Sequence, residues 1–294
     1  MRLRLATGVA GAAVVLGAIW LGSPWLTLLA LLGGGLAVRE AYRLAPPGVG
    51  EMPAALGATA AAALLLAAEA AASRDFHLAS GLVLAAWALA ALLWFIACYW
   101  GGRVPAEGSL VEAADTDAGW GELPWRGFLF LLLAPVYVGF LLGHGLAMRD
   151  LSGGEGDLGR AWLLFTLLVV FACDTGAFAV GRLAGRRPMA PRISPNKTWE
   201  GAAGGFFASI GAALLTGLAF DLSVTLWQQA LVGAVAGVAA QAGDLFESAL
   251  KRGTNVKDSG SIMPGHGGIL DRMDSILFAL PAVFYMLLAV GLRL

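Results

Sequence analysis

The chain has 294 residues, of which 59% are hydrophobic and only 13% are charged, and its mean hydropathy is +0.76. Soluble domains carry roughly 25% charged residues, so the composition excludes an ordinary soluble protein. The net charge of −1 says little about partners, although we expect no nucleic acid among them. Cys98 and Cys173 both lie in apolar stretches, which is typical of small core residues and implies no disulfide framework.

Apolar segments long enough to cross a hydrocarbon core of about 30 Å recur along the chain. They are continuous rather than alternating, which excludes a β-barrel and predicts an all-α, polytopic integral membrane protein. We expect about nine transmembrane helices, near residues 5–22, 25–44, 52–72, 77–100, 124–147, 160–184, 199–220, 224–250 and 269–292. The first segment has features of a signal peptide, but it is long for one and leads directly into a second span, so we expect a retained helix.

The positions of the basic residues predict the orientation of these helices. With the N-terminus in the cytoplasm, most lysines and arginines lie on the cytoplasmic side. The outer side keeps only Arg74, Arg149, Arg160 and Arg293. We therefore expect a protein of the cytoplasmic (inner) membrane, with residues 1–150 forming about five N-terminal spans. We expect residues 151–294 to form a C-terminal transmembrane region whose polar segments, candidates for catalytic motifs, face the cytoplasm.

Within the eighth predicted span, four polar residues share one helix face at positions i, i+3, i+4 and i+7: Asp244, Glu247, Ser248 and Lys251. Polar side chains inside an apolar span need a paired cation, a water-filled cavity or a metal. An ion pair between Glu247 and Lys251, worth roughly a few tenths of a kcal/mol, would explain two of them. That pair leaves Asp244 without a partner.

Asp271 and Asp274 lie three residues apart at the start of the last predicted span, so both carboxylates emerge on one helix face. Hard oxygen ligands of this kind suit Mg²⁺, which typically uses one or two carboxylates with substrate phosphates and water. Three aspartates converging at low dielectric could not all ionise without a cation. We therefore predict that Asp244, Asp271 and Asp274 bind Mg²⁺, with a purely structural ion-pair network as the alternative. Arg272 would then point toward a phosphate or another carboxylate.

A glycine cluster at residues 265–268 precedes that helix. Backbone N–H groups of Gly267 and Gly268 can approach an anion closely, and a helix N-terminus adds a favourable dipole. A glycine-rich turn alone is weak evidence, but three cations lie nearby in the sequence: Lys251, Arg252 and Lys257. Together these residues predict a phosphate cradle. His266 could donate to a phosphate oxygen, protonate leaving pyrophosphate, or hold the loop as a structural donor, and the sequence leaves these roles open.

A second polar segment begins at Asp174, which lies within an apolar span and is therefore a functional candidate. Further along, Ser194 and Pro195 are expected to open a helix. Its first turn would hold three polar residues: Lys197, Thr198 and Glu200. A cation in a first turn opposes the helix macrodipole, and a bound anion would resolve that conflict.

The two segments resemble the signature of the phosphatidate cytidylyltransferase (CDP-diacylglycerol synthase) family. One family pattern reads S-x-aliphatic-K-R, four residues, K-D, then P-x-H-G-G-x-x-D-R-x-D. It is matched by Ser248, Lys251, Arg252, Lys257, Asp258, Pro264, His266, Gly267, Gly268, Asp271, Arg272 and Asp274. The other patterns, A-x-D-T/S-x-A-aromatic and S-P-x-K-T-x-E-G, are matched by Asp174, Thr175, Ala177, Phe178, Ser194, Pro195, Lys197, Thr198, Glu200 and Gly201. A match of this length at fixed spacing is specific.

The resemblance implies the reaction CTP + phosphatidate → CDP-diacylglycerol + pyrophosphate, with Mg²⁺ and room for a second cation such as K⁺. It also implies a homodimer in contact with membrane lipid. The implied catalytic residues are Asp244, Lys251, His266, Asp271, Arg272 and Asp274. The implied substrate-binding residues are Asp174, Ser194, Lys197, Thr198, Glu200, Ser248, Arg252, Lys257, Asp258, Gly267 and Gly268.

Three other functions compete with this interpretation. A CTP-dependent lipid kinase of the dolichol or phytol type would act on an alcohol, and the complete H-G-G-x-x-D-R-x-D pattern argues against it. A CDP-alcohol phosphotransferase would carry D-x-x-D-G-x-x-A-R, but Ser275 follows Asp274 where that motif has glycine. A secondary transporter would show paired broken helices and internal repeats, which the sequence lacks.

Overall fold

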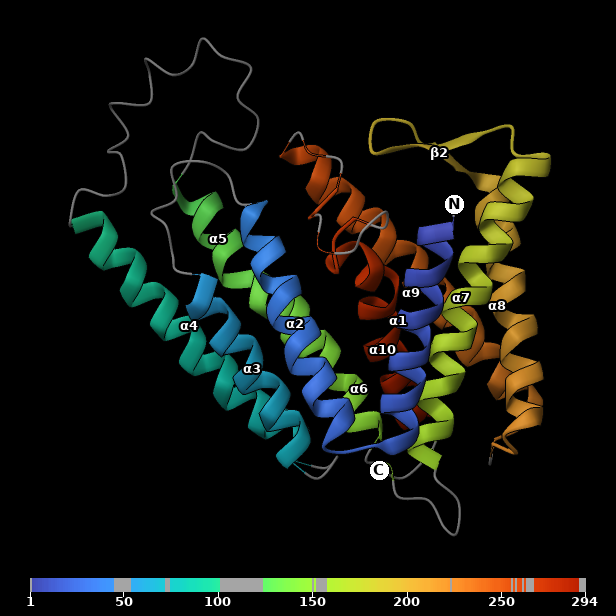
Figure 1. Ribbon diagram of the computed structural model, residues 1–294, viewed down its shortest axis with the longest axis horizontal. Helices are drawn as coiled ribbons and strands as arrows, with labels where there is room; N and C mark the ends of the chain where they lie inside the picture. Colours follow the sequence, from blue (N-terminus) through green and yellow to red (C-terminus); the bar gives the residue numbers. More distant parts are fainter. Residues whose placement is uncertain are drawn as a thin grey trace.

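The computed structural model describes residues 2–44, 54–71, 75–100, 124–149, 151, 158–222, 224–254, 256, 258–260, 262 and 267–290. Its N-terminal helices are α1 (Arg2–Leu21), α2 (Trp25–Arg43), α3 (Ala54–Ala70) and α4 (Phe76–Trp100). A continuous helical run follows, made of α5 (Pro124–Pro135), the π-helical turn η2 (Val136–Phe140) and α6 (Leu141–Arg149). The C-terminal helices are α7 (Leu158–Ala184), α8 (Trp199–Ala219), α9 (Leu226–Gly253) and α10 (Leu270–Ala289) (Figure 1).

The all-α membrane fold is confirmed, because each predicted span corresponds to a helical run with ends shifted by at most a few residues. Six helical segments of the described chain are long and apolar enough to cross a membrane. They are Phe76–Ala97, Leu132–Arg149, Leu158–Ala184, Trp199–Ala219, Leu226–Gly253 and Leu270–Ala289. The apolar parts of α1 and α3 are shorter, Thr7–Leu21 and Ala54–Ala70, so the number of nine spans stays a prediction.

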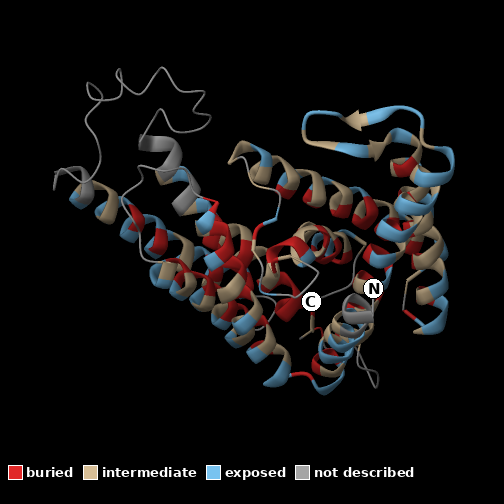
Figure 2. Ribbon diagram, turned by 45° about the horizontal axis from the view of Figure 1, so that its top comes forward, coloured by how far each residue is buried: buried red, intermediate tan, exposed pale blue. Residues whose placement is uncertain are grey.

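Most side chains that point away from the helix bundle are apolar, as expected for a protein surrounded by lipid. Leu183, Phe207 and Leu215 are among the most exposed large hydrophobic residues. The buried residues gather where the helices meet (Figure 2). Between helices, small residues allow close approach, as where Gly176 of α7 meets the backbone of Gly204 on α8.

The N-terminal and C-terminal regions share one of the hydrophobic clusters. Leu270 and Leu277 of α10 are buried in the same cluster as Ala37 and Val38 of α2 and Val138 of η2. The start of α10 is therefore supported by helices that precede residue 150. This packing brings α2 next to the segment that carries the last polar motif.

A β-hairpin interrupts the helical pattern between α7 and α8, made of strands β1 (Pro188–Ala190) and β2 (Ser194–Thr198), which pair antiparallel. The prediction that Ser194 and Pro195 open a helix is wrong, because the chain is extended there and α8 begins only at Trp199. Thr198 is the N-cap, and its hydroxyl accepts a hydrogen bond from Gly201 N at 3.1 Å. Lys197 therefore lies in a strand and does not oppose the helix dipole.

The polar segments gather at one end of the bundle. Figure 1 shows the hairpin, the end of α9 and the start of α1 near the same edge of the molecule, and the C-terminus at the opposite edge. Basic residues in the last turn of α9, Lys251 and Arg252, suit the negative end of that helix dipole. Predicted functional residues on β2 and at the end of α9 are thus carried by elements that lie toward this end (Figure 1).

Candidate active site

The first component of the site is an ion pair between β2 and α9. Lys197 Nζ lies 2.6 Å from Asp244 Oδ2, and the two side chains are 24% and 35% exposed. Lys197 is thus the partner that Asp244 lacked in the sequence pattern. The extended conformation of β2 makes the pair possible, because it carries the hairpin across to the polar face of α9.

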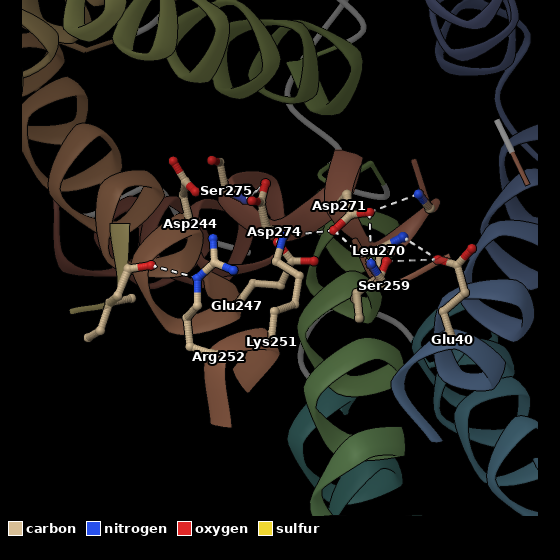
Figure 3. Close-up of polar contacts among 12 residues, drawn as sticks. Glu40, Asp244, Glu247, Lys251, Arg252, Ser259, Leu270, Asp271, Asp274 and Ser275 are labelled. Carbon is tan, nitrogen blue, oxygen red and sulfur yellow. Dashed lines mark hydrogen bonds and ion pairs between the residues drawn. The ribbon is translucent and has the colours of Figure 1, made fainter. Parts of the chain in front are cut away.

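The second component centres on Lys251, one turn beyond Glu247 on α9. Lys251 Nζ donates to Glu247 Oε2 at 3.0 Å and to Asp271 Oδ1 at 2.8 Å (Figure 3). The predicted pair between Glu247 and Lys251 is therefore present, and Asp271 of α10 joins it. Glu247 is fully buried, and Lys251 is the donor to its Oε2.

Asp271 is held by backbone donors as well as by Lys251. Its two carboxylate oxygens accept hydrogen bonds from Ser259 N at 3.2 and 3.1 Å, and Oδ2 accepts from Gly268 N at 2.8 Å. The N–H group of Gly268 is thus directed at a carboxylate of the protein itself. Gly267 has a φ of +81°, which glycine adopts without strain and which allows the turn into α10.

Asp244 on α9 and Asp274 on α10 lie close enough for their negatively charged carboxylates to repel each other. Their side chains lie near each other in Figure 3, with Ser275 beside them. Ser275 N donates to Asp274 Oδ1 at 2.6 Å. Asp174 on α7 interacts electrostatically with both carboxylates. The acidic side chains therefore outnumber the cations that are paired with them.

Mg²⁺ requires several oxygen ligands around one point. In the described part of the chain, no three His, Cys, Asp or Glu side chains are grouped closely enough to hold a metal ion. Asp271, one of the three aspartates predicted to bind Mg²⁺, is engaged by Lys251 and by two backbone N–H groups. Binding of Mg²⁺ by the three aspartates stays a prediction. Asp244 pairs with Lys197 through Oδ2, and Asp274 Oδ1 accepts from Ser275 N, so each has fewer donors among the described residues than Asp271. Mg²⁺ is commonly held by one or two carboxylates.

The hairpin is fastened to the helices by two further predicted residues. Arg252 Nε donates to the carbonyl oxygen of Ile193 at 3.2 Å. Glu200 Oε2 accepts from Arg186 N at 3.0 Å and from Arg187 N at 3.2 Å. Arg252 and Glu200 thus position the strand that carries Lys197.

The remaining predicted residues divide by position. Ser194 on β2 and Ser248 on α9 are half-buried near the ion pairs, whereas Asp258 and Arg272 are exposed. Arg272 interacts electrostatically with Asp174. Lys257 and His266 lie outside the described residues, so their predicted roles stay predictions.

Sequence reasoning missed two residues of the N-terminal region. Glu40 on α2 is fully buried, and its Oε2 accepts from Leu270 N at 2.9 Å and from Ser259 Oγ at 3.3 Å. Tyr137 in η2 stacks edge-on to Phe246 of α9, with ring centroids 5.3 Å apart. Its hydroxyl is buried without a hydrogen-bond partner among the described residues. The one available signal was a charged residue, Glu40, inside a predicted span.

The chain is similar to known proteins along most of its length. The family model described as the cytidylyltransferase family matches residues 2–290. The phosphatidate cytidylyltransferase of Bacillus subtilis (strain 168) is 40% identical over 158 residues, which is 54% of this chain and 57% of the relative. The enzymes of the same name from Staphylococcus epidermidis (strain ATCC 12228) and Staphylococcus aureus (strain COL) are 43% identical over 159 and 161 residues, or 54% and 55% of this chain.

Each match to those two staphylococcal proteins covers 58% of the relative. The chain thus matches a little over half the length of these curated relatives, whereas the family model extends over nearly the entire sequence. Because the model match includes the paired lysines and carboxylates on β2, α9 and α10, the chain belongs to the cytidylyltransferase family.

Proposed function

We propose that the protein transfers the cytidylyl group of CTP to phosphatidate, forming CDP-diacylglycerol and pyrophosphate. The observation that carries the proposal is the convergence of two lysines and several carboxylates from β2, α9 and α10. Relatives about 40% identical are named phosphatidate cytidylyltransferase, which supports the same reaction and substrates. Membrane lipid as the acceptor agrees with the apolar helices that surround the site.

This reaction does not need a nucleophilic side chain from the protein. A phosphate oxygen of phosphatidate is itself a nucleophile, which attacks the α-phosphorus of CTP in line with the departing oxygen. A new P–O bond forms, the bond from the α-phosphorus to the bridging oxygen breaks, and pyrophosphate leaves with that electron pair. The protein must therefore position two anionic substrates and stabilise the developing charge, rather than supply a covalent intermediate.

Lys197 and Lys251 are the residues that we assign to these tasks. Each ammonium is held by carboxylates, at 2.6 Å from Asp244 and 2.8 Å from Asp271, so it needs little rearrangement when an anion binds. Preorganised cations contribute more to the transition state than mobile ones, because their orientation is already fixed. Arg252 and Glu200 act indirectly, because their hydrogen bonds hold the hairpin that carries Lys197.

We assign Mg²⁺ to Asp244 and Asp274, with Asp174 nearby, and not to Asp271. Mg²⁺ bound there would neutralise negative charge on the substrate phosphates. The support is the excess of acidic groups around these two residues and the engagement of Asp271 by other donors. Ligation by two carboxylates with substrate phosphates and water is the usual way in which proteins hold this ion.

We further propose that the protein lies in the cytoplasmic membrane with this site toward the cytoplasm, as the distribution of basic residues predicts. CTP would then reach the site from water and phosphatidate from the adjacent leaflet. A homodimer stays a prediction from the family resemblance.

The proposal is tested with the purified full-length protein in lipid nanodiscs, supplied with CTP and Mg²⁺. One sample contains phosphatidate, a second a polyprenol, and a third neither. Mass spectrometry of the lipids should show CDP-diacylglycerol in the first sample alone, with one pyrophosphate per molecule formed. A phosphorylated polyprenol would support a lipid kinase instead, and no lipid product in any sample would contradict both enzymes.

A further inference from the structure

Glu40 connects the N-terminal helices to the segment that carries Asp271. It lies on α2, its side chain is fully buried, and its Oε2 accepts hydrogen bonds from Leu270 N at 2.9 Å and Ser259 Oγ at 3.3 Å. A buried carboxylate is costly unless donors compensate it, so these bonds are a structural requirement of its position. Figure 3 shows Glu40 approaching the α10 start from the side opposite to Lys251.

The start of α10 lacks a cap of its own. Ile269 is the N-cap residue and makes no side-chain capping bond. The carboxylate of Glu40 takes that role from another helix, because it accepts from the first N–H of α10, at Leu270. A negative charge at a helix N-terminus is also favoured by the macrodipole.

The loop before α10 is shaped to let this carboxylate approach. A Cβ atom added at Gly260 or at Gly268 would collide with the carboxylate of Glu40. A side chain at either position would displace this carboxylate, and Gly268 belongs to the predicted phosphate cradle. One function of that glycine is to allow contact with Glu40.

Ser259 and Leu270 connect Glu40 to Asp271, the carboxylate that binds Lys251. Ser259 donates its hydroxyl to Glu40 and its N–H to Asp271, and Leu270 directly precedes Asp271 in the chain. Asp271 in turn holds Lys251 at 2.8 Å. We propose that Glu40 is a positioning residue, which fixes Ser259 and the first turn of α10 so that Asp271 keeps Lys251 in place for catalysis. The catalytic part of this inference rests on the proposed function.

The structural part is tested by hydrogen exchange of the full-length protein in nanodiscs, without substrates. Glu40→Ala should speed exchange at the amide of Leu270 roughly tenfold or more, because its hydrogen bond to a charged acceptor is lost. The amide of Ser259, which donates to Asp271, should also exchange faster, because the Ser259 hydroxyl loses its bond to Glu40. Glu40→Gln should show a smaller increase, since its amide oxygen can still accept from Leu270 N. Glu69→Gln on α3 is the matched control and should leave both amides unchanged.

Two results would overturn the structural part. One is an unchanged exchange rate at Leu270 in Glu40→Ala. The other is an equal acceleration in α7 and α8, which would show general destabilisation instead of release of this loop. Neither result depends on what the protein catalyses, so they are independent of the proposed reaction.

The catalytic part is tested by a double-mutant cycle with Ser259→Ala. Glu40→Ala should lower kcat about tenfold or more with little change in the KM for CTP, and Glu40→Gln should recover part of it. Once Glu40 is alanine, Ser259→Ala should cost less than about twofold more, because contacting residues are not additive. Fully multiplicative losses would contradict the positioning role, whereas an inactive wild-type protein would contradict the proposed function.

Discussion

Lys197 lies on β2 and Lys251 on α9, and each forms an ion pair with a carboxylate of α9 or α10. Asp244 holds the first, and Glu247 with Asp271 holds the second. The pairs of the two lysines differ in burial: Lys197 and Asp244 are partly exposed, whereas Glu247, a partner of Lys251, is fully buried. Exposed pairs contribute little to folding, so Lys197 allows the effect of its charge on activity to be separated from its effect on stability.

We predict that Lys197→Met lowers kcat/KM by roughly 100-fold or more, as expected when one preorganised donor to a developing charge is removed. The free energy of unfolding should change by less than about 1 kcal/mol, since the pair is partly solvated. Arg192→Gln, at an exposed position in the turn of the same hairpin, is the control and should retain activity. If Lys197→Met kept normal activity, the assignment of Lys197 to the active site would be wrong.

Asp274 is predicted to determine the response to Mg²⁺. Asp274→Asn should raise the Mg²⁺ concentration at half-maximal rate by roughly tenfold or more, because changes around a metal site typically cost 10- to 100-fold in affinity. Initial rates measured against free Mg²⁺ give this value. Because Asn keeps an acceptor oxygen for Ser275 N, the start of α10 should stay intact.

Two further variants serve as comparisons for Asp274→Asn. Asp221→Asn changes an exposed aspartate between α8 and α9 and should leave the Mg²⁺ response unchanged. Asp271→Asn should lose activity that added Mg²⁺ does not restore, since it removes the charge that holds Lys251. The opposite result would be recovery of Asp271→Asn activity by added Mg²⁺, together with an unchanged Mg²⁺ concentration at half-maximal rate in Asp274→Asn. It would mean that Asp271, and not Asp274, binds the metal.

The β1–β2 hairpin is held to α8 and α9 by polar contacts. Glu200→Ala should release it, because the carboxylate accepts from the N–H groups of Arg186 and Arg187. We expect faster hydrogen exchange in the hairpin and a higher KM for CTP. Glu200→Gln is the matched control, since it retains an acceptor oxygen and should resemble the wild type. An unchanged hairpin in Glu200→Ala would show that other contacts suffice.

The helices could be predicted from sequence because their apolar segments are long and uninterrupted, as in α7 and α8. The hairpin could not, because Ser194 and Pro195 are equally typical of a helix start, and tertiary contacts decided between them. The same hairpin accounts for the pairing of Lys197 with Asp244. Residues so far apart in the chain leave no periodic signal, so only the folded structure shows that pair.

Glu40 illustrates what the arrangement of the complete fold adds. The C-terminal motifs predicted the residues around Lys251 and Asp271, but nothing in them indicates a partner on α2. A lone glutamate beside Arg39 is readily taken as part of a charged helix end. Its contact with Leu270 depends on how α2 packs against α10, which is set by apolar residues such as Val38 and Leu277.

The direction of the fold in the membrane can be tested by cysteine labelling. Arg192 in the hairpin and Asp221 are exposed at opposite ends of α8, whose 21 residues span about 30 Å. In a protein with Cys98 and Cys173 replaced by alanine, an impermeant maleimide should label Asp221→Cys in intact cells. It should label Arg192→Cys only in opened membranes. The reverse pattern would place the site on the outer side.

The claim that the paired lysines and carboxylates serve cytidylyl transfer is tested most directly by following two phosphorus atoms of CTP. Purified protein in nanodiscs with phosphatidate and Mg²⁺ is given CTP labelled at the α-phosphate or at the γ-phosphate. We predict that the α-label enters the lipid while the γ-label is released as pyrophosphate, and that Lys197→Met suppresses both. Transfer of the γ-label to lipid, or no release of pyrophosphate, would contradict the account.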